Sequence, residues 1–400
     1  MKTMIFWGTL CAVPVLLLAA NFAGLAGSGP AQISGDYKLL APITQGDLTI
    51  FPVVSSKAHD TSGFLTLDEG IRSGEVVVTE AGNLHGAMRR RPGQQYQPAR
   101  GAQVNTLVLV NNSKLPLLLL AGEVVTGGKQ DRVVGKDRII PAESDPVDLA
   151  VFCVEPGRWI EKSTKFDTHA SVMAQPSVRK KAMADADQQK VWDEVNSSKA
   201  VMSARVAPPP AVAGHASGGG GGGVGSGSGS GSGGGVAGGV YASDPATVRA
   251  LASTTSYAVA VENSAVKKQV DSITEPMQKS YESVIKQLRN QNAVGVVVAV
   301  RGHIVWVDIF ASPQLLSKYW PKLLQSYAAE ALTSSGARAE VNMKDAQHFL
   351  EDWQARHETV ESEPGLYRQR ELRGERFRAF ELTSLLPNRG FDVHLSKMAE

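Results

Sequence analysis

Residues 294–310 have the sequence VGVVVAVRGHIVWVDIF, in which two runs of β-branched and aromatic residues flank Arg301-Gly302. Two such runs around a two-residue turn are typical of a β-hairpin. Ser312-Pro313 follows directly and favours the start of a helix, because serine caps a helix and proline fits its first turn. Apolar residues then recur every three or four positions, which predicts a helix to residue 332 that buries Leu316, Trp320, Leu323, Tyr327 and Ala328.

Further helices and strands are predicted around this segment. Asp244-Pro245 predicts the start of a helix, and the apolar residues of 266–288 share one helical face, on which Pro276 predicts a kink or a break. Asp345 is expected to cap a shorter helix that buries Phe349, Leu350 and Trp353. The remaining strands of this half are expected at 366–372, 375–382 and 391–395.

The N-terminal half of the chain has mostly strand patterns. Single strands are expected at 48–54, 75–80 and 147–154, and a second hairpin is expected from 104–110 and 115–120. Thr66 and Glu69 have the spacing of a capping box, which predicts a short helix over 67–73. Pro176 predicts a longer helix, whose apolar side is Ala184, Val191, Trp192, Val195 and Met202.

Helices and strands do not alternate regularly along the chain, which disfavours a parallel doubly wound sheet. We therefore predict an α+β fold, with mainly antiparallel strands in the N-terminal half and helices plus β-hairpins in the C-terminal half. The chain of 400 residues is 42% hydrophobic, so it can bury a substantial core. Its formal net charge is only +2 and its charges are interspersed, which argues against nucleic-acid binding. Arg89-Arg90-Arg91 is interpreted as a solvated loop.

The first 26 residues have the pattern of a secretory signal peptide. Lys2 is the only charged residue before Asp36, an apolar stretch follows it, and small residues come next at Gly24-Leu25-Ala26. We expect export to the periplasm or the extracellular space. A retained membrane anchor is the alternative, and beyond this leader no apolar run is long enough to span a membrane. With Cys11 in the leader, Cys153 has no partner for an intramolecular disulfide or a thiolate zinc site.

A proline-rich, glycine-rich and serine-rich segment occupies residues 208–239. It lacks the apolar side chains needed to offset its ordering entropy, so we predict a disordered insert. Composition alone allows it to join two domains or to interrupt one. The rest of the mature chain is residues 36–400.

The first candidate site is the segment 122–132, GEVVTGGKQDR. Gly122 and Gly127 have the separation of a phosphate-binding loop, but Gly128 stands where that motif requires lysine, so the motif fails. What remains is a flexible turn with polar side chains that could present donors to an anion: Glu123, Gly127, Gly128, Lys129, Gln130 and Arg132. An ordinary turn in which Glu123 pairs with Lys129 or Arg132 is the structural alternative.

The second candidate site follows the strand at 147–154. Arg158 beside Trp159 suits contact with a planar anionic ligand, and Glu155 lies at the same strand end. The alternative is an Arg158–Glu155 pair with Trp159 in the core. Cys153 could act as a nucleophile only beside a base, and a buried inert thiol fits its strand face better.

No metal or cofactor is predicted. The histidines, including His303 and His394, show no metal-ligand spacing, and no dinucleotide-binding or nucleophile-elbow motif occurs at a strand–helix junction.

Several segments resemble the ARG-and-rhodanese-phosphatase-superfamily-associated protein family, a bacterial domain of unknown function. The similar segments are 65–69 (LTLDE), 117–132, 151–159, 191–195 (VWDEV), 294–310, 312–332 and 365–367 (GLY). Because they lie on both sides of 208–239, the resemblance implies one domain with an insert. The family usually has asparagine where Asp131 stands, and many members lack a long glycine–serine tract. The resemblance implies a shared fold and motif set but no reaction.

Three hypotheses for function follow from these patterns. The leading one is a non-catalytic cell-envelope domain that binds a small anionic ligand or a protein partner through the two candidate segments, where strand ends carry glycine, charge and an aromatic ring. The second is a hydrolase or transferase for a phosphate-bearing or nucleotide-like compound, with Glu123 or Glu155 as general base. The third is a purely structural or assembly role.

Overall fold

The hairpin predicted from residues 294–310 forms as β13 (Asn292–Val300) and β14 (His303–Phe310). Arg301 and Gly302 between them have φ angles of 53° and 81°, both positive as a tight two-residue hairpin turn requires. This computed structural model describes residues 36–83, 105–168, 172–207 and 244–400. The leader at 1–26, the arginines at 89–91 and the insert at 208–239 lie outside the described residues.

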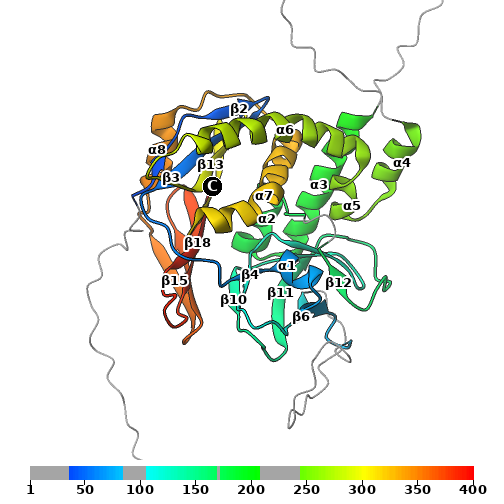
Figure 1. Cartoon of the computed structure of the whole chain (residues 1–400). Helices are drawn as coiled ribbons and strands as arrows, with labels where there is room; N and C mark the ends of the chain where they lie inside the picture. The colour runs from blue at the N-terminus through cyan, green and yellow to red at the C-terminus, as the bar shows by residue number, and fades with distance from the viewer. Residues whose placement is uncertain (1–35, 84–104, 169–171, 208–243) are drawn as a thin grey trace, which may run out of the picture.

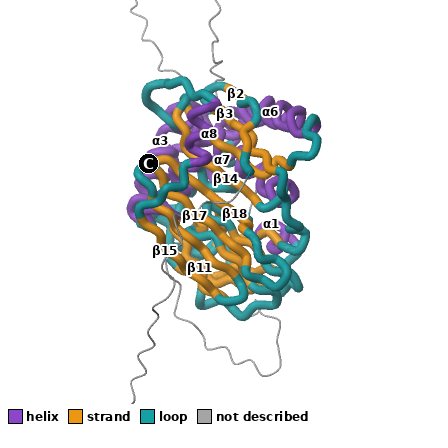
Figure 2. Tube along the Cα trace, turned by 90° about the vertical axis from the view of Figure 1, so that its left-hand side faces the viewer, coloured by secondary structure: helices purple, strands orange, loops and turns teal. Residues whose placement is uncertain are grey.

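The hairpin belongs to an antiparallel sheet of nine strands. Its hydrogen-bonded order is β1 (Lys38–Leu39), β3 (Leu48–Ser55), β13, β14, β18 (Asp392–Ala399), β17 (Phe377–Ser384), β16 (Tyr367–Arg373) and β15 (His357–Glu363), with β2 (Ile43–Gln45) paired to β3. Figure 2 looks onto this sheet. Strands from both sides of residues 208–239 therefore pair directly, as β3 does with β13.

Both faces of this sheet are covered. Val296 and Val298 belong to the core beneath the helices, whereas Val297 and Ala299 belong to a second core that includes residues of α8 (Met343–Glu351). The longest helices, α6 (Ser264–Lys286) and α7 (Pro313–Thr333), lie on the first face, and α8 lies at the other side in Figure 1. A strand buried on both faces explains the continuous valine run in β13, since neither side can be polar.

A second group of strands forms the lower part of Figure 1. Its six-stranded antiparallel sheet has the order β12 (Phe166–Asp167), β8 (Val124–Gly127), β9 (Arg132–Val134), β11 (Val147–Cys153), β6 (Thr106–Asn111) and β5 (Val76–Thr79). A bridge between Thr79 and Lys165 brings the two ends of this sheet together. A three-stranded sheet lies beside it, in the order β10 (Arg138–Ile140), β7 (Leu117–Leu119) and β4 (Leu65–Thr66).

The predicted α+β class is confirmed, with strands dominating the N-terminal half and helices with hairpins the C-terminal half. The predicted caps of three helices are also confirmed. Thr66 and Glu69 form a complete capping box on α1 (Leu67–Arg72), Asp244 caps α4 (Pro245–Ser253), and Ser312 caps α7. Helix α6 continues through Pro276 without a break.

The second predicted hairpin is wrong, although both of its strands exist. β6 pairs with β5 and β11, whereas β7 pairs with β10 and β4 in the other sheet. The connection between them is held by Asn111, whose amide donates to the carbonyls of Leu115 (2.8 Å) and Pro141 (2.9 Å). These bonds tie the turn to a distant loop instead of closing a ladder.

The prediction of one continuous helix from Pro176 is also wrong. It consists of α2 (Pro176–Lys180), a π-helical turn over Lys181–Asp185, and α3 (Gln188–Val206). Ala186 has a φ of 47°, which ends the first helix, and Asp187 caps the next one.

Two smaller differences concern the C-terminal half. Asn342, not Asp345, caps α8. β15 was not predicted, because its polar sequence lacks a strand pattern.

No helix within the described residues combines the length and apolar character needed to cross a membrane.

Candidate functional site

The structure brings the two predicted segments into direct contact. The amide nitrogen of Asp131 donates a hydrogen bond to the Glu155 carboxylate (3.0 Å). The side-chain nitrogen of Gln130 donates to the Glu155 carbonyl (3.2 Å). β9 and β11, which carry the two segments, are antiparallel neighbours with Cys153 opposite Arg132. Two segments separated along the chain therefore form one polar cluster.

Arg158 joins the cluster together. Its guanidinium donates to the Glu155 carboxylate (2.5 Å) and to the carbonyls of Gly128 (2.9 Å), Gly127 (3.2 Å) and Ile160 (2.6 Å). These bonds engage both terminal nitrogens of the guanidinium. Arg158 is consequently a positioning residue for the glycine turn, with its charge directed at the protein rather than at solvent.

The two glycines of the turn fit beneath the segment 163–166. Gly128 has a φ of 46°, and a Cβ atom there would lie 2.2 Å from the Phe166 ring. Gly127 has a φ of 127°, and its Cβ would lie 2.6 Å from the Ser163 hydroxyl. A side chain at either position would therefore meet both backbone strain and a collision.

Trp159 lies at the surface side of the cluster, with 45% of its area exposed, so it is not a core residue. The ammonium of Lys129 lies 5.1 Å from its ring centroid, within the range of a cation–π contact. Arg132 is fully buried, 6.0 Å from the same ring and 4.0 Å from the Glu80 carboxylate. Arg132 is thus closed off from any ligand in solution.

Glu123 belongs to a different cluster. It lies before β8, whereas the glycine turn begins at the last residue of that strand, and its carboxylate pairs with Lys322 of α7 at 2.5 Å. The same lysine pairs with Asp68 at 2.8 Å. Lys322 therefore fixes α7 to the six-stranded part of the molecule. Glu123 is a buried structural partner here and does not share a site with Glu155.

Cys153 is fully buried at the end of β11. Its backbone amide and carbonyl bond to the side chain of Gln188 (2.8 Å and 2.9 Å), which holds α3 against the strand. Burial raises the pKa of the thiol, so it stays protonated and unreactive at neutral pH.

The pKa values of the two carboxylates of the cluster are shifted in opposite directions. Burial raises the pKa of Asp131, although the Ser256 hydroxyl opposes this by donating to it at 2.6 Å. Burial also acts on Glu155, but Arg158 outweighs it and holds the pKa of that carboxyl below its ordinary value. Glu155 is therefore the anion around which the cluster is built.

A cleft of about 890 Å³ opens beside this cluster, between the glycine turn, β12 and α5 (Tyr257–Val261). Its lining is mostly apolar with charges at intervals: Ile71, Thr126, Gly127, Asp131, Lys162, Ser163, Lys165, Phe166, Asp167, Ala258, Val259 and Glu262. The bond from Ser256, the cap of α5, to Asp131 fixes one wall to the other.

Of the residues predicted for the site from the sequence, only Gly127 lines this cleft. Lys162 and Lys165 follow Trp159 closely, and this basic spacing next to Phe166 was a usable signal. The α5 wall could not be predicted, because a helix of five residues has too little periodicity. None of three other predicted residues lines the cleft. They belong to the polar cluster beside it: Arg132, Glu155 and Arg158.

A buried charge cluster, which the sequence did not predict, lies between the sheets and the helices. His394 of β18 bonds to Asp137 (2.7 Å) and Asp308 (3.2 Å), and Arg179 of α2 holds Asp308 with two bonds (3.0 and 3.2 Å). Tyr327 of α7 also donates to Asp308. All five side chains are buried. These residues come from five distant segments, so no sequence motif marks them.

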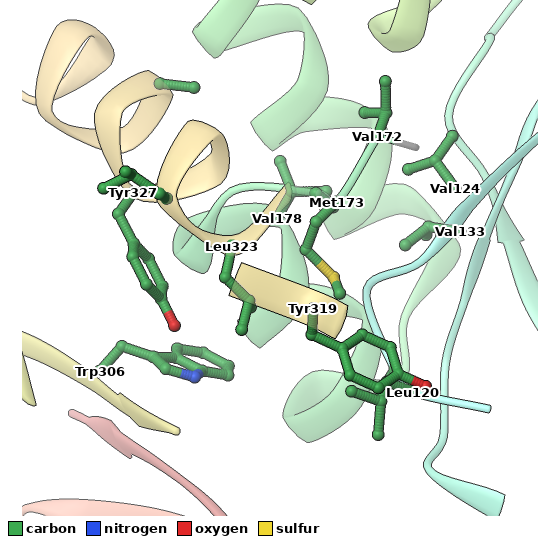
Figure 3. Close-up of a cluster of buried hydrophobic side chains, with 14 of the residues drawn as sticks. Leu120, Val124, Val133, Val172, Met173, Val178, Trp306, Tyr319, Leu323 and Tyr327 are labelled. Atoms are coloured by element: carbon green, nitrogen blue, oxygen red, sulfur yellow. The ribbon is translucent and has the colours of Figure 1, made fainter. Parts of the chain in front are cut away.

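Apolar side chains surround this charge cluster and connect the two sheets. Figure 3 shows Leu120, which follows β7, beside Tyr319 of α7, and Tyr327 beside Trp306. Val124 and Val133 of the six-stranded sheet belong to the same core. The core is therefore shared between the part that carries the cleft and the part that carries the nine-stranded sheet.

Replacing Arg158 by alanine is expected to lower the free energy of unfolding by about 2 kcal/mol, because the buried Glu155 carboxylate loses its charged donor. Hydrogen exchange at residues 127–131 should rise at the same time, since the turn loses two carbonyl contacts. Urea unfolding and exchange mass spectrometry measure both effects. Arg338→Ala, which removes an exposed arginine paired with Asp47, is the control; equal losses in the two variants would contradict the positioning role.

A family model described as the ARG and Rhodanese-Phosphatase-superfamily-associated Protein domain matches residues 36–398 of the chain. That range contains the polar cluster and every residue that lines the cleft. No curated protein and no solved structure matches the chain significantly.

Proposed function

The chain belongs to the ARG and Rhodanese-Phosphatase-superfamily-associated Protein family, and on this premise we propose that it is an exported, non-catalytic binding protein of the cell envelope. Its ligand is a small molecule with an apolar body and an anionic group. The observation that carries this proposal is the cleft itself, which is built on the rigid cluster of Glu155 and Arg158 and lies within the family domain.

The lining supports this class of ligand. Its volume of about 890 Å³ lies in the range of small-molecule sites, which are mostly apolar with a few polar groups that fix orientation. Phe166 and Val259 offer apolar contact, and Val259 is half-exposed although it is apolar. Lys162 and Lys165 are the cations of the lining, in place of the predicted Arg132 and Arg158. Lys162 lies 3.4 Å from Glu155, which holds its ammonium at the cleft wall.

Catalysis is the less favoured alternative. A hydrolase or transferase would need an accessible carboxylate beside free cations, but Glu123 is paired with Lys322 and Glu155 with Arg158. Asp131 is the better acid–base candidate. Its pKa is raised and that of Glu155 is lowered, and catalytic carboxylate pairs also have pKa values shifted apart by their surroundings. The family's usual asparagine at this position disfavours a reaction that depends on it.

Export rests on the leader pattern of residues 1–26. Expression of the full chain in a Gram-negative host, followed by fractionation and N-terminal sequencing, tests it. We expect the protein in the periplasm with a new N-terminus near residue 27. A cytoplasmic protein that starts at Met1 would contradict export.

The ligand proposal is tested by a thermal-shift screen with sugar phosphates, nucleotides and aromatic carboxylates, followed by calorimetric titration of the hits. Lys162→Ala is expected to weaken a hit about tenfold, since a charge-assisted hydrogen bond is worth about 1.5–3 kcal/mol. Val259→Asp, which places a like charge in the cleft, is expected to abolish binding.

Lys344→Ala on α8 is the matched control, because this lysine is exposed and lies outside the cleft. A hit whose affinity is unchanged by Lys162→Ala and by Val259→Asp binds elsewhere and contradicts the proposal. Turnover of a hit that is lost in Asp131→Asn would favour the catalytic alternative instead.

A further inference from the structure

β15 forms one edge of the nine-stranded sheet, and all seven of its residues are exposed. It pairs with β16 on one side, and no other described strand or helix pairs with it. Figure 2 shows it at the margin of the sheet. An edge strand of this length leaves a row of backbone N–H and C=O groups available for pairing with another chain.

The charges that normally protect such an edge are paired within the chain. Glu358 pairs with Arg370 at 2.9 Å and Glu363 pairs with Arg138 at 3.6 Å. Glu361 forms an ion pair with Lys136. Each acidic side chain of β15 therefore has a cation from its own chain. These partly exposed pairs weaken the repulsion of an incoming strand without removing it, so glutamates placed directly opposite each other still repel.

We propose that β15 is the contact surface for a second copy of this chain, paired antiparallel about a twofold axis at Val360. This register pairs all seven residues of the strand with the same seven residues of the other copy. Val360, which is 52% exposed, meets its own counterpart. His357 lies opposite Glu363, Glu358 opposite Ser362, and Thr359 opposite Glu361.

Charge complementarity distinguishes this fully paired register from its two immediate neighbours. With the axis at Val360 no like charges face each other, and like charges directly opposite are destabilising in an antiparallel pair. A shift by one residue in one direction sets Glu358 opposite Glu361, and in the other direction it sets Glu358 opposite Glu363. The strand is therefore self-complementary, as the isologous interface of a twofold dimer requires. This inference does not depend on the cleft.

Cysteine cross-linking tests the register. Val360→Cys, in the full chain with Cys11→Ser, is expected to form a disulfide-linked dimer under mild oxidation, since opposed residues of antiparallel strands lie within disulfide reach. His357→Cys is the matched control: it is also exposed, but it lies six residues from its own counterpart. Cys153 is buried and does not compete.

Sedimentation velocity over a range of protein concentrations gives the second measurement. The wild-type chain is expected to dimerise reversibly, and Val360→Lys is expected to weaken dimerisation at least about tenfold because it opposes two lysines. Because residue 360 is exposed, the thermal unfolding midpoint of the variant should match that of the wild type. A wild-type chain that stays monomeric, a dimer insensitive to Val360→Lys, or equal cross-linking at 357 and 360 would each overturn the proposal.

Discussion

Asp308→Ala is expected to lower the free energy of unfolding by about 3–5 kcal/mol, the range observed when one partner of a buried ion pair is removed. Asp308 and Arg179 are both fully buried, and two hydrogen bonds join them. Without the carboxylate, the Arg179 guanidinium loses the two hydrogen bonds of its ion pair and keeps the Trp306 ring, 4.4 Å away, as a neighbour. A buried cation without its counter-charge is what makes the loss large.

Chemical denaturation of the wild type and the variant measures this loss. Glu375→Ala is the matched control, because Glu375 pairs with Arg356 at 3.1 Å with both side chains largely exposed. Such surface pairs contribute about 0–1 kcal/mol. If Asp308→Ala does not accumulate as folded protein, Asp308→Asn retains the side-chain shape without the charge and should show a smaller loss. A loss for Asp308→Ala no greater than that for Glu375→Ala would contradict the central role of the cluster.

The stability of the wild type is expected to fall between neutral and alkaline pH because of His394. Burial alone would lower the pKa of this imidazole, but Asp137 and Asp308 outweigh burial and raise it to about 9. In the unfolded chain the pKa of histidine is about 6.5. The stabilisation from the charged imidazole is therefore complete below pH about 6.5 and is lost as pH rises through about 9.

The shift between these pKa values corresponds to roughly 3 kcal/mol, at about 1.4 kcal/mol for each pKa unit. Urea unfolding from pH 6 to pH 10 measures it, and the difference between wild type and His394→Gln isolates it from other titrating groups. The wild type should lose its advantage over the variant toward alkaline pH. A difference that stays constant across this range would show that His394 does not carry the charge.

The parts of the fold that depend on local patterns could be predicted from the sequence. The hairpin at Arg301-Gly302 and the caps at Thr66 and Ser312 use only neighbouring residues, and all three are confirmed. Strand pairing depends on distant partners. This is why β6 and β7 were identified as strands but paired wrongly, and why the polar β15 was missed.

The candidate site could be predicted only in part, for the same reason. Two strand ends carry glycines, charged residues and an aromatic, and this pattern predicted that they form one site. The hydrogen bond from Asp131 to Glu155 joins the two strand ends. The sequence does not reveal which charged side chains are already paired within the protein. Arg132 and Arg158 are held by the protein itself, while Lys162 from the next segment lines the cleft.

The position of β18 has a consequence for how the chain acquires its structure. Residues 392–399 lie in the interior of the sheet, between β14 and β17, so the ladder has a gap until they arrive. Synthesis must pass residue 399 before the two sides of the gap can meet, and pairings between such distant residues form slowly. A chain cut short by these eight residues would leave two strand edges exposed in its centre. The two sides of the gap should therefore join only when residues 392–399 are available for pairing, so the complete nine-stranded sheet should form late in folding.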